Sequence, residues 1–219
     1  MRGQRRAPDD RPVAYLVAME MLPAVFASGW ASGVNAYATA FILGALGRFL
    51  GVGGVPEGLQ RTDVLIIVGV LAAVELVADK VPYIDSTWDA ISTVIRPIAG
   101  AVIGALFAGA QGDLMTITLA SVGGLTALVS HLTKAGLRLA INTSPEPVTN
   151  VAASVSGDVA VAGVASLAML APTVAAVIAG VLLLTGVALS WFAARRIKRG
   201  WRALQRWRAG RRAADPPAP

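Results

Sequence analysis

Residues 74–97, VELVADKVPYIDSTWDAISTVIRP, join two apolar segments through a short charged turn, and this stretch decides the fold. The turn contains Pro82, and Ser86 with Asp89 three residues later resembles the capping box of a helix start. The charged residues flank the turn: Glu75, Asp79 and Lys80 end the first segment, and Asp85, Asp89 and Arg96 begin the second. The stretch therefore predicts two helices joined by a charged turn.

The composition around this stretch is that of a membrane protein. Hydrophobic residues make up 55% of the chain and charged residues 15%, with a mean hydropathy of +0.64, whereas roughly a quarter of the residues of a soluble domain are charged. Several apolar runs approach the roughly 20 residues that cross a bilayer as a helix. Long runs without strict alternation favour helices over a closed barrel. We therefore expect an all-α, polytopic helical membrane bundle over residues 13–194.

Both ends of the chain are basic. Residues 1–12 carry four Arg and residues 195–219 carry eight Arg and one Lys, which together are thirteen of the nineteen basic residues. Because Lys and Arg close to membrane spans are retained in the cytoplasm, we expect both tails on the cytoplasmic side of the inner membrane. Two cytoplasmic ends require an even number of crossings.

Seven apolar runs are present, at residues 13–29, 36–50, 62–80, 90–110, 114–141, 151–170 and 172–191. An even number of crossings leaves one run over, so we expect about six transmembrane helices and one re-entrant or peripheral segment. The candidates for that segment are residues 36–50, which are short, and residues 151–170, which Gly157 and Asp158 interrupt.

Two pairs of segments resemble each other. SGVNAYATAFILGALGR from Ser32 is similar to GGLTALVSHLTKAGLR from Gly123, and RPIAGAVIGAL from Arg96 is similar to APTVAAVIAGV from Ala171. Duplicated halves with interrupted helices are a recurring plan in transporters. An internal duplication is one interpretation, and chance alignment of small apolar residues is the other.

Charged residues inside the apolar runs are the candidates for function. Glu75 and Asp79 are four residues apart and share one helix face, and His131, Lys134 and Arg138 form a stripe on a later run. An ionisable residue inside a span is a functional hypothesis whose partner has to be named. We expect the acidic face to meet the basic stripe, with Glu75 opposite Lys134; Arg96, seven residues after Asp89, is a further basic candidate. Two alternatives remain: the charges near residue 80 lie among headgroups, or the ion pairs only fix helix register.

No metal, cofactor or catalytic site is expected. Asp85, Asp89 and Glu146 offer the oxygen ligands that calcium or magnesium prefer, but capping accounts for Asp89 and nothing in the sequence makes the three converge. His131 is the only histidine and there is no cysteine. The glycines at residues 51–58 lack the Lys-Ser/Thr of a phosphate loop. These observations argue against an enzyme.

The C-terminal segment RRIKRGWRALQRWRAGRR begins at Arg195 and places Ile197, Trp201, Leu204 and Arg208 along one side of a helix. This is the pattern of an interfacial helix attracted to anionic lipids, and nucleic-acid binding is not expected. A second feature concerns packing: the GxxxG spacing of Gly100 and Gly104 permits close approach of another helix. That helix would belong to the same chain or to a second copy in a homo-oligomer.

Five ordered motifs carry a family resemblance. SGVNAYAT, VELVADKVPYIDSTWD, the run IRPIAG from Ile95, HLTKAGLRLAINTSPEPVTN and the following Ser154 resemble the bacterial membrane family catalogued as domain of unknown function 4126, over roughly residues 28–190. The resemblance implies an integral membrane protein without an established activity. The family has acidic residues after the SPEP segment, where this chain has Ser156-Gly157-Asp158. The Arg-rich tail is a feature of this member.

The sequence thus predicts a small transporter or channel for a proton, a cation or a small anion, with a non-transporting scaffold or lipid-interacting protein as the alternative. Its site would lie mid-bundle, where interrupted helices near Asn35 and Asn150 expose backbone groups. The expected substrate- or ion-binding residues are Asn35, Glu75, Asp79, Lys80, Arg96, His131, Lys134, Arg138, Glu146 and Asn150. The expected structural or capping residues are Asp85, Ser86, Asp89 and Ser144.

Overall fold

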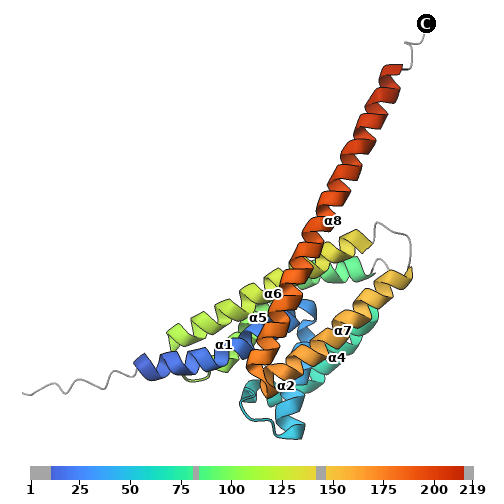
Figure 1. The fold of residues 1–219 in the computed structure, drawn as a ribbon. Coiled ribbons are helices and arrows are strands. Elements are labelled where there is room, and N and C mark those ends of the chain that lie inside the picture. The colour runs from blue at the N-terminus through green and yellow to red at the C-terminus, as the bar shows by residue number, and fades with distance from the viewer. Residues whose placement is uncertain (1–10, 81–83, 142–146, 215–219) are drawn as a thin grey trace, which may run out of the picture.

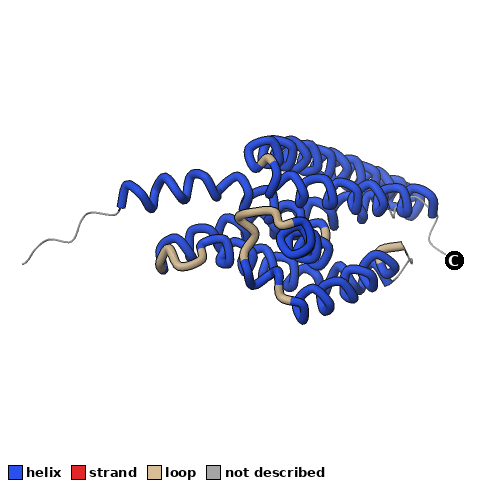
Figure 2. Tube along the Cα trace, turned by 90° about the horizontal axis from the view of Figure 1, so that it is seen from below, coloured by secondary structure: helices blue, strands red, loops and turns tan. Residues whose placement is uncertain are grey.

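A computed structural model describes residues 11–80, 84–141 and 147–214, and all of the regular structure in these ranges is helical (Figures 1 and 2). The helices are α1 (Arg11–Val34), α2 (Ala36–Leu50), α3 (Glu57–Gln60), α4 (Thr62–Ala78), α5 (Ile84–Ala108), α6 (Asp113–Ile141), α7 (Pro147–Leu170) and α8 (Pro172–Ala214). The expected all-α class is therefore confirmed. Within the described ranges, four stretches are long and apolar enough to cross a membrane: Thr87–Ala108, Asp113–Leu139, Val151–Leu170 and Pro172–Trp207.

The centre of the bundle is formed by α1, α5 and α6, which approach closely through small residues. A Cβ atom added to Gly100 of α5 would lie 2.6 Å from the carbonyl oxygen of Gly123 in α6. One added to Gly29 of α1 would lie 2.8 Å from the same oxygen. The GxxxG stripe of α5 is therefore covered by α6 of the same chain, and a homo-oligomer would need another surface.

The remaining helices pack around this centre. α2 lies against α4 and α7, and α8 packs against α1, α6 and α7. One hydrophobic cluster joins α1, α7 and α8 around Trp30 and Val161, and another joins α1, α2, α5 and α6 around Leu43 and Leu119. α4 presents an apolar face to its surroundings, with Ile66 and other large side chains exposed, as a helix facing lipid would.

The break between α1 and α2 is a single residue. We expected the first helix to end near Gly29, but the small residues before Val34 remain helical because they pack against α6. Only Asn35 leaves the helix, with φ −151° and ψ 103°, and its Oδ1 accepts a hydrogen bond from the backbone N–H of Ala38 at 2.9 Å. The expected second run coincides with α2.

One expected helix cap is not found. α5 is helical from Ile84, the first described residue after the gap at 81–83, so Ser86 lies within the helix and the expected capping box with Asp89 is wrong. α4 begins at Thr62, and Arg61 at its N-cap position makes no side-chain capping bond. The charged turn at 81–83 and the segment 142–146, which includes Ser144 and Glu146, lie outside the described residues.

One expected interruption is also absent, and one helix extends beyond the apolar run that predicted it. α7 passes through Gly157 and Asp158 without a break. α8 continues well past Trp191, where we expected its span to end, and its 43 residues form one helix that projects from the bundle (Figure 1). At about 1.5 Å per residue this helix is about 64 Å long, roughly twice the thickness of the hydrocarbon core.

Helix directions follow from the residues that touch. Along α1, Gly29 meets Gly123 and Gly33 meets Ala127 of α6, so these two helices run parallel. Ser190 of α8 lies against residues 133–136 of α6, while the beginning of α8 packs against α1. α8 therefore also runs in the direction of α6.

As a result, the start of α1 and the end of α8 lie at opposite ends of the bundle (Figure 1). The expected number of crossings, with both ends on one side of the membrane, stays a prediction. The proposed duplication stays a prediction, since its first pair matches a broken region at Asn35 with the uninterrupted α6.

Candidate functional site

A group of seven ionisable side chains meets between α4, α5 and α6, and we call it the buried charge network. Its members are Glu75, Asp79, Asp89, Arg96, His131, Lys134 and Arg138. No side chain in its ion pairs is more than 14% exposed. The network contains three carboxylates and three permanently basic groups, so its ionised form is neutral overall.

The deepest ion pair joins α4 to α5. Nη2 of Arg96 donates to Oε1 of Glu75 at 2.6 Å, and each side chain is 1% exposed. The expected pairing of Glu75 with Lys134 is therefore wrong. Glu75 and Asp79 are one helical turn apart, and α6 places Lys134 beside Asp79. The guanidinium of Arg96 reaches the other carboxylate from α5.

Asp79 holds two cations on one oxygen. Nζ of Lys134 donates to Oδ2 of Asp79 at 2.8 Å, and Nη2 of Arg138 lies 2.9 Å from the same oxygen. Nη1 of Arg138 donates to Oδ2 of Asp89 at 2.9 Å. Asp89, which we expected to cap a helix, is instead an ion-pair partner.

His131 links the arginine to a hydroxyl. Nη1 of Arg96 lies 2.8 Å from Nδ1 of His131, and because an arginine can only donate, Nδ1 is the acceptor. In the neutral ring the proton is then on Nε2, 3.0 Å from Oγ1 of Thr93, and that hydroxyl donates to the carbonyl of Asp89 at 2.9 Å. These contacts define one tautomer of His131.

The cations also satisfy the end of α1. Nζ of Lys134 donates to the carbonyl of Val34 at 2.8 Å, and Nη1 of Arg96 donates to that of Gly33 at 3.4 Å. The last carbonyls of a helix lack partners within it and carry partial negative charge, so cations stabilise this end. Asn35 is 2% exposed beside these contacts, and its side chain caps α2.

The other candidates lie elsewhere or are not described. Nζ of Lys80 bonds the carbonyl of Leu76 at 2.8 Å and Oδ2 of Asp158 at 3.3 Å, which ties α4 to α7 outside the network. Asn150 lies in the first turn of α7, but its side chain is not described, and neither are those of Asp85, Ser86, Ser144 and Glu146. Among the described residues no group of three metal-ligating side chains is found.

Sequence reasoning missed Thr93 and misassigned Asp89. Both belong to one stripe of α5, because Asp89, Thr93 and Arg96 stand at i, i+4 and i+7. Three polar residues at this spacing in an apolar helix predict a face turned toward a partner rather than a cap. That signal was available in the sequence.

A cavity of about 350 Å³ lies between α1, α6, α7 and α8 and reaches the network from its basic side. Lys134 and Arg138 line it, together with Trp30, Ser130, Ser154 and Leu182 among others. The three carboxylates of the network do not line it. The cavity therefore presents positive charge in largely apolar surroundings.

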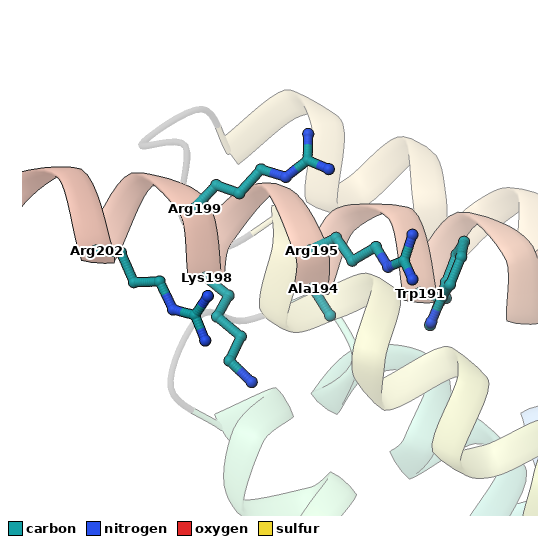
Figure 3. Close-up of a pocket in the computed structure, with 6 residues that line it drawn as sticks. All are labelled: Trp191, Ala194, Arg195, Lys198, Arg199 and Arg202. Atoms are coloured by element: carbon teal, nitrogen blue, oxygen red, sulfur yellow. The ribbon is translucent and has the colours of Figure 1, made fainter.

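A second hollow of about 450 Å³ runs along the exposed part of α8 (Figure 3). All of its lining residues belong to this one helix: Trp191, Ala194, Arg195, Lys198, Arg199 and Arg202. The guanidinium of Arg195 lies 3.4 Å from the centre of the Trp191 ring. This feature is a basic surface with an aromatic member, not an enclosed site.

Apolar helices of spanning length with a charge network among them define a helical membrane protein. A family model described as Domain of unknown function (DUF4126) matches residues 22–192, and the chain belongs to this family. The matched range contains every member of the buried charge network and ends before the Arg-rich part of α8. Neither a curated protein nor a solved structure matches the chain.

Proposed function

We propose that the protein is a small membrane carrier that binds an anionic solute at Lys134 and Arg138 and uses the buried charge network as its switch. The observation that supports it most is the position of Oδ2 of Asp79, which lies 2.8 Å from one of these cations and 2.9 Å from the other. Both cations also line the cavity. An anion arriving there competes with Asp79 for Lys134 and Arg138, which already share one oxygen of that carboxylate.

The switch follows from charge balance. Three carboxylates oppose three cations in the network, so an anion bound to Lys134 leaves one carboxylate in excess, and a proton or cation can compensate it. Oε2 of Glu75, Oδ1 of Asp79 and Nε of Arg96 make no hydrogen bond to described protein groups. A network built for stability alone is expected to satisfy such atoms, because unpaired buried polar groups are costly. The spare capacity favours exchange of partners.

α4 is the element that would respond. It packs mainly against α2 and is held to α5 and α6 through its two acids. Release of Asp79 by an incoming anion would weaken that hold. Coupling between solute binding and a helix movement is what alternating access requires.

The alternative function is a non-transporting scaffold in which the ion pairs fix the helices. It is favoured by the depth of the Arg96–Glu75 pair, since each side chain is 1% exposed. In this case the Arg-rich part of α8 would carry the activity by gathering anionic lipids, for which clusters of basic residues beside a span are suited.

The proposed membrane topology has five crossings and a re-entrant hairpin formed by α1 and α2. Four crossings are the spanning stretches of α5 to α8, and the fifth is α4, whose 17 residues are at the lower limit for a span. The 15 residues of α2 extend about 22 Å, less than the roughly 30 Å of a hydrocarbon core. The tip of the hairpin at Asn35 is buried, and broken helices are tolerated at such depth where protein surrounds them. The basic end of α8 would lie in the cytoplasm of a cell whose inner membrane holds the protein.

Flux from liposomes tests the carrier proposal. The probes are protons, chloride, inorganic phosphate and dodecyl phosphate, each measured for the full chain, for Asp79→Asn and for Glu75→Gln. Asp63→Asn is the matched control, because Asp63 is 58% exposed and forms a surface ion pair with nearby Arg61, away from the network. Flux that Asp79→Asn abolishes and Asp63→Asn keeps supports a carrier. Folded protein without flux of any probe, or with flux unchanged in both network variants, favours the scaffold.

A further inference from the structure

We infer that the cavity between α1, α6, α7 and α8 binds an amphipathic anion, in which a single alkyl chain carries a carboxylate or phosphate group. The inference rests on the proposed function, since it names the class of solute for the same two cations. Three features of the cavity support it: hydrogen-bond donors in one part, apolar walls in the rest, and an opening toward the surroundings of the bundle.

The donors come from two facing helices. The ammonium group of Lys134 has three N–H bonds; one is used by the carbonyl of Val34 and one by Oδ2 of Asp79, which leaves the third for a ligand. On α7, Ser154 is 4% exposed and its Oγ forms no hydrogen bond to described protein groups. A buried hydroxyl without a partner is uncommon, and it lines the same cavity as Lys134.

The charge of this region favours an anion over a neutral ligand. Lys134 and Arg138 line the cavity, and the carboxylates that balance them lie behind, on α4 and α5. A carboxylate or phosphate group accepts charge-assisted hydrogen bonds, which are roughly twice as strong as neutral ones. The bound headgroup would accept the third N–H of Lys134 and compete with Asp79 for its charge.

The rest of the cavity is apolar and too large for an inorganic ion alone. Trp30, Ala160 and Leu182 form walls without charge, and the volume of about 350 Å³ falls among the roughly 300–1,000 Å³ of small-molecule sites. An inorganic anion would leave these walls uncovered, whereas an alkyl chain would pack against them.

The opening of the cavity faces the surroundings of the bundle. Ser156 is exposed, Leu182 is 37% exposed, and α6 and α7 make few contacts with each other although both pack against α8. For spanning helices, those surroundings are lipid. An amphipathic anion already in the bilayer can therefore enter the cavity from the lipid, and its chain stays in an apolar environment along the way.

Quenching of Trp30 fluorescence provides a direct test of binding. Trp30 lines the cavity and is 6% exposed, and replacing Trp88, Trp191, Trp201 and Trp207 by Phe makes it the only tryptophan. The probe is 11-bromoundecanoate added to the full chain in neutral lipid nanodiscs. We expect saturable quenching, with at least tenfold weaker quenching by the neutral 11-bromoundecanol. Displacement by dodecyl phosphate but not by inorganic phosphate would show that the site binds alkyl-chain anions with either a carboxylate or a phosphate headgroup.

Two substitutions on α7 separate the cavity from the bilayer. A Cβ atom at Gly157 would lie 3.6 Å from Cγ1 of Val34, an ordinary contact, and Gly157 lines the cavity, so we expect the side chain of Gly157→Leu to occupy it. At Gly163, on the same helix, nothing lies within 4 Å. Gly157→Leu should reduce the affinity at least tenfold, and Gly163→Leu should leave it unchanged.

Equal quenching by the acid and the alcohol, or equal quenching in both leucine variants, would overturn the inference, because the probe would then only partition into the lipid. Displacement by inorganic phosphate would overturn it in favour of a simple anion site. Saturable binding without Asp79-dependent flux of any probe would keep this inference and refute the carrier. Asp79-dependent chloride or phosphate flux without binding of the alkyl-chain anion would do the reverse.

Discussion

Nη2 of Arg96 lies 2.6 Å from Oε1 of Glu75, and both side chains are 1% exposed, so an arginine of α5 neutralises a carboxylate of α4 inside the bundle. α4 has few other contacts with α5. The pair therefore contributes much of the attachment between these helices. Its energetic value lies in the two charges being together, because removing either one would leave the buried network with an excess charge.

Removing one partner of this pair should be far worse than removing both. We expect Glu75→Ala to lower the free energy of unfolding by about 3–5 kcal/mol, since two carboxylates would then have to balance three buried cations. The double variant Glu75→Leu with Arg96→Met should recover most of that loss. Thermal unfolding in detergent measures both, and Asp63→Asn at the exposed pair with Arg61 is the control. A double variant no more stable than Glu75→Ala would show that the pair is not coupled in this way.

The positions of the helices along the chain were largely predictable from hydropathy. The bounds of α2 coincide with the expected run at residues 36–50, and Pro172 begins α8 as expected. The meeting of acids on α4 with bases on α6 was also visible, because the spacing of His131, Lys134 and Arg138 defines one face of a helix. Such spacing depends only on the geometry of a single helix, so the sequence alone predicts which residues share a face.

What the sequence did not provide was the tertiary placement of each charge. Spacing along α4 cannot tell whether Glu75 or Asp79 lies level with Lys134, because this depends on how far α4 slides along α6. The same holds for Asp89, whose spacing from Ser86 suits a cap as well as an ion pair until the structure shows that Ser86 lies within α5. The helix directions that separate the two ends also arise from packing, through contacts such as Gly29 with Gly123.

His131 is expected to act by holding Arg96 in place. Nδ1 of His131 accepts from Nη1 of Arg96 at 2.8 Å, and Nε2 lies 3.0 Å from Oγ1 of Thr93. His131→Leu removes both contacts and should cost about 1–3 kcal/mol of stability, the penalty of leaving buried donors unpaired. Leu139→Ala is the control on α6, because that side chain is 70% exposed. Equal stability of the two variants in thermal unfolding would contradict this role.

Gly100 should be intolerant of even a methyl group. A Cβ atom there would lie 2.6 Å from the carbonyl of Gly123 and from Cβ of Ala127, so α5 and α6 would have to separate. We expect Gly100→Ala to cost about 1–3 kcal/mol through overpacking. Gly163→Ala, with open space at its Cβ, should be neutral. Similar melting temperatures for the two variants would show that the helices are not this close.

The two ends of the chain should face opposite sides of the membrane. The protein has no cysteine, so single cysteines can be labelled with a membrane-impermeant maleimide in spheroplasts and in inverted vesicles. Gly200→Cys and Gly53→Cys have no atom within 4 Å of the new Cβ, and Met19 is 70% exposed. Because α1 runs parallel to α6 and α8, we expect Gly200→Cys to react only from the cytoplasmic side. Met19→Cys and Gly53→Cys should react only from the other side. Labelling of Met19→Cys and Gly200→Cys from the same side would instead require the even number of crossings that the basic ends predict, and the packing of α1 against α6 would then be wrong.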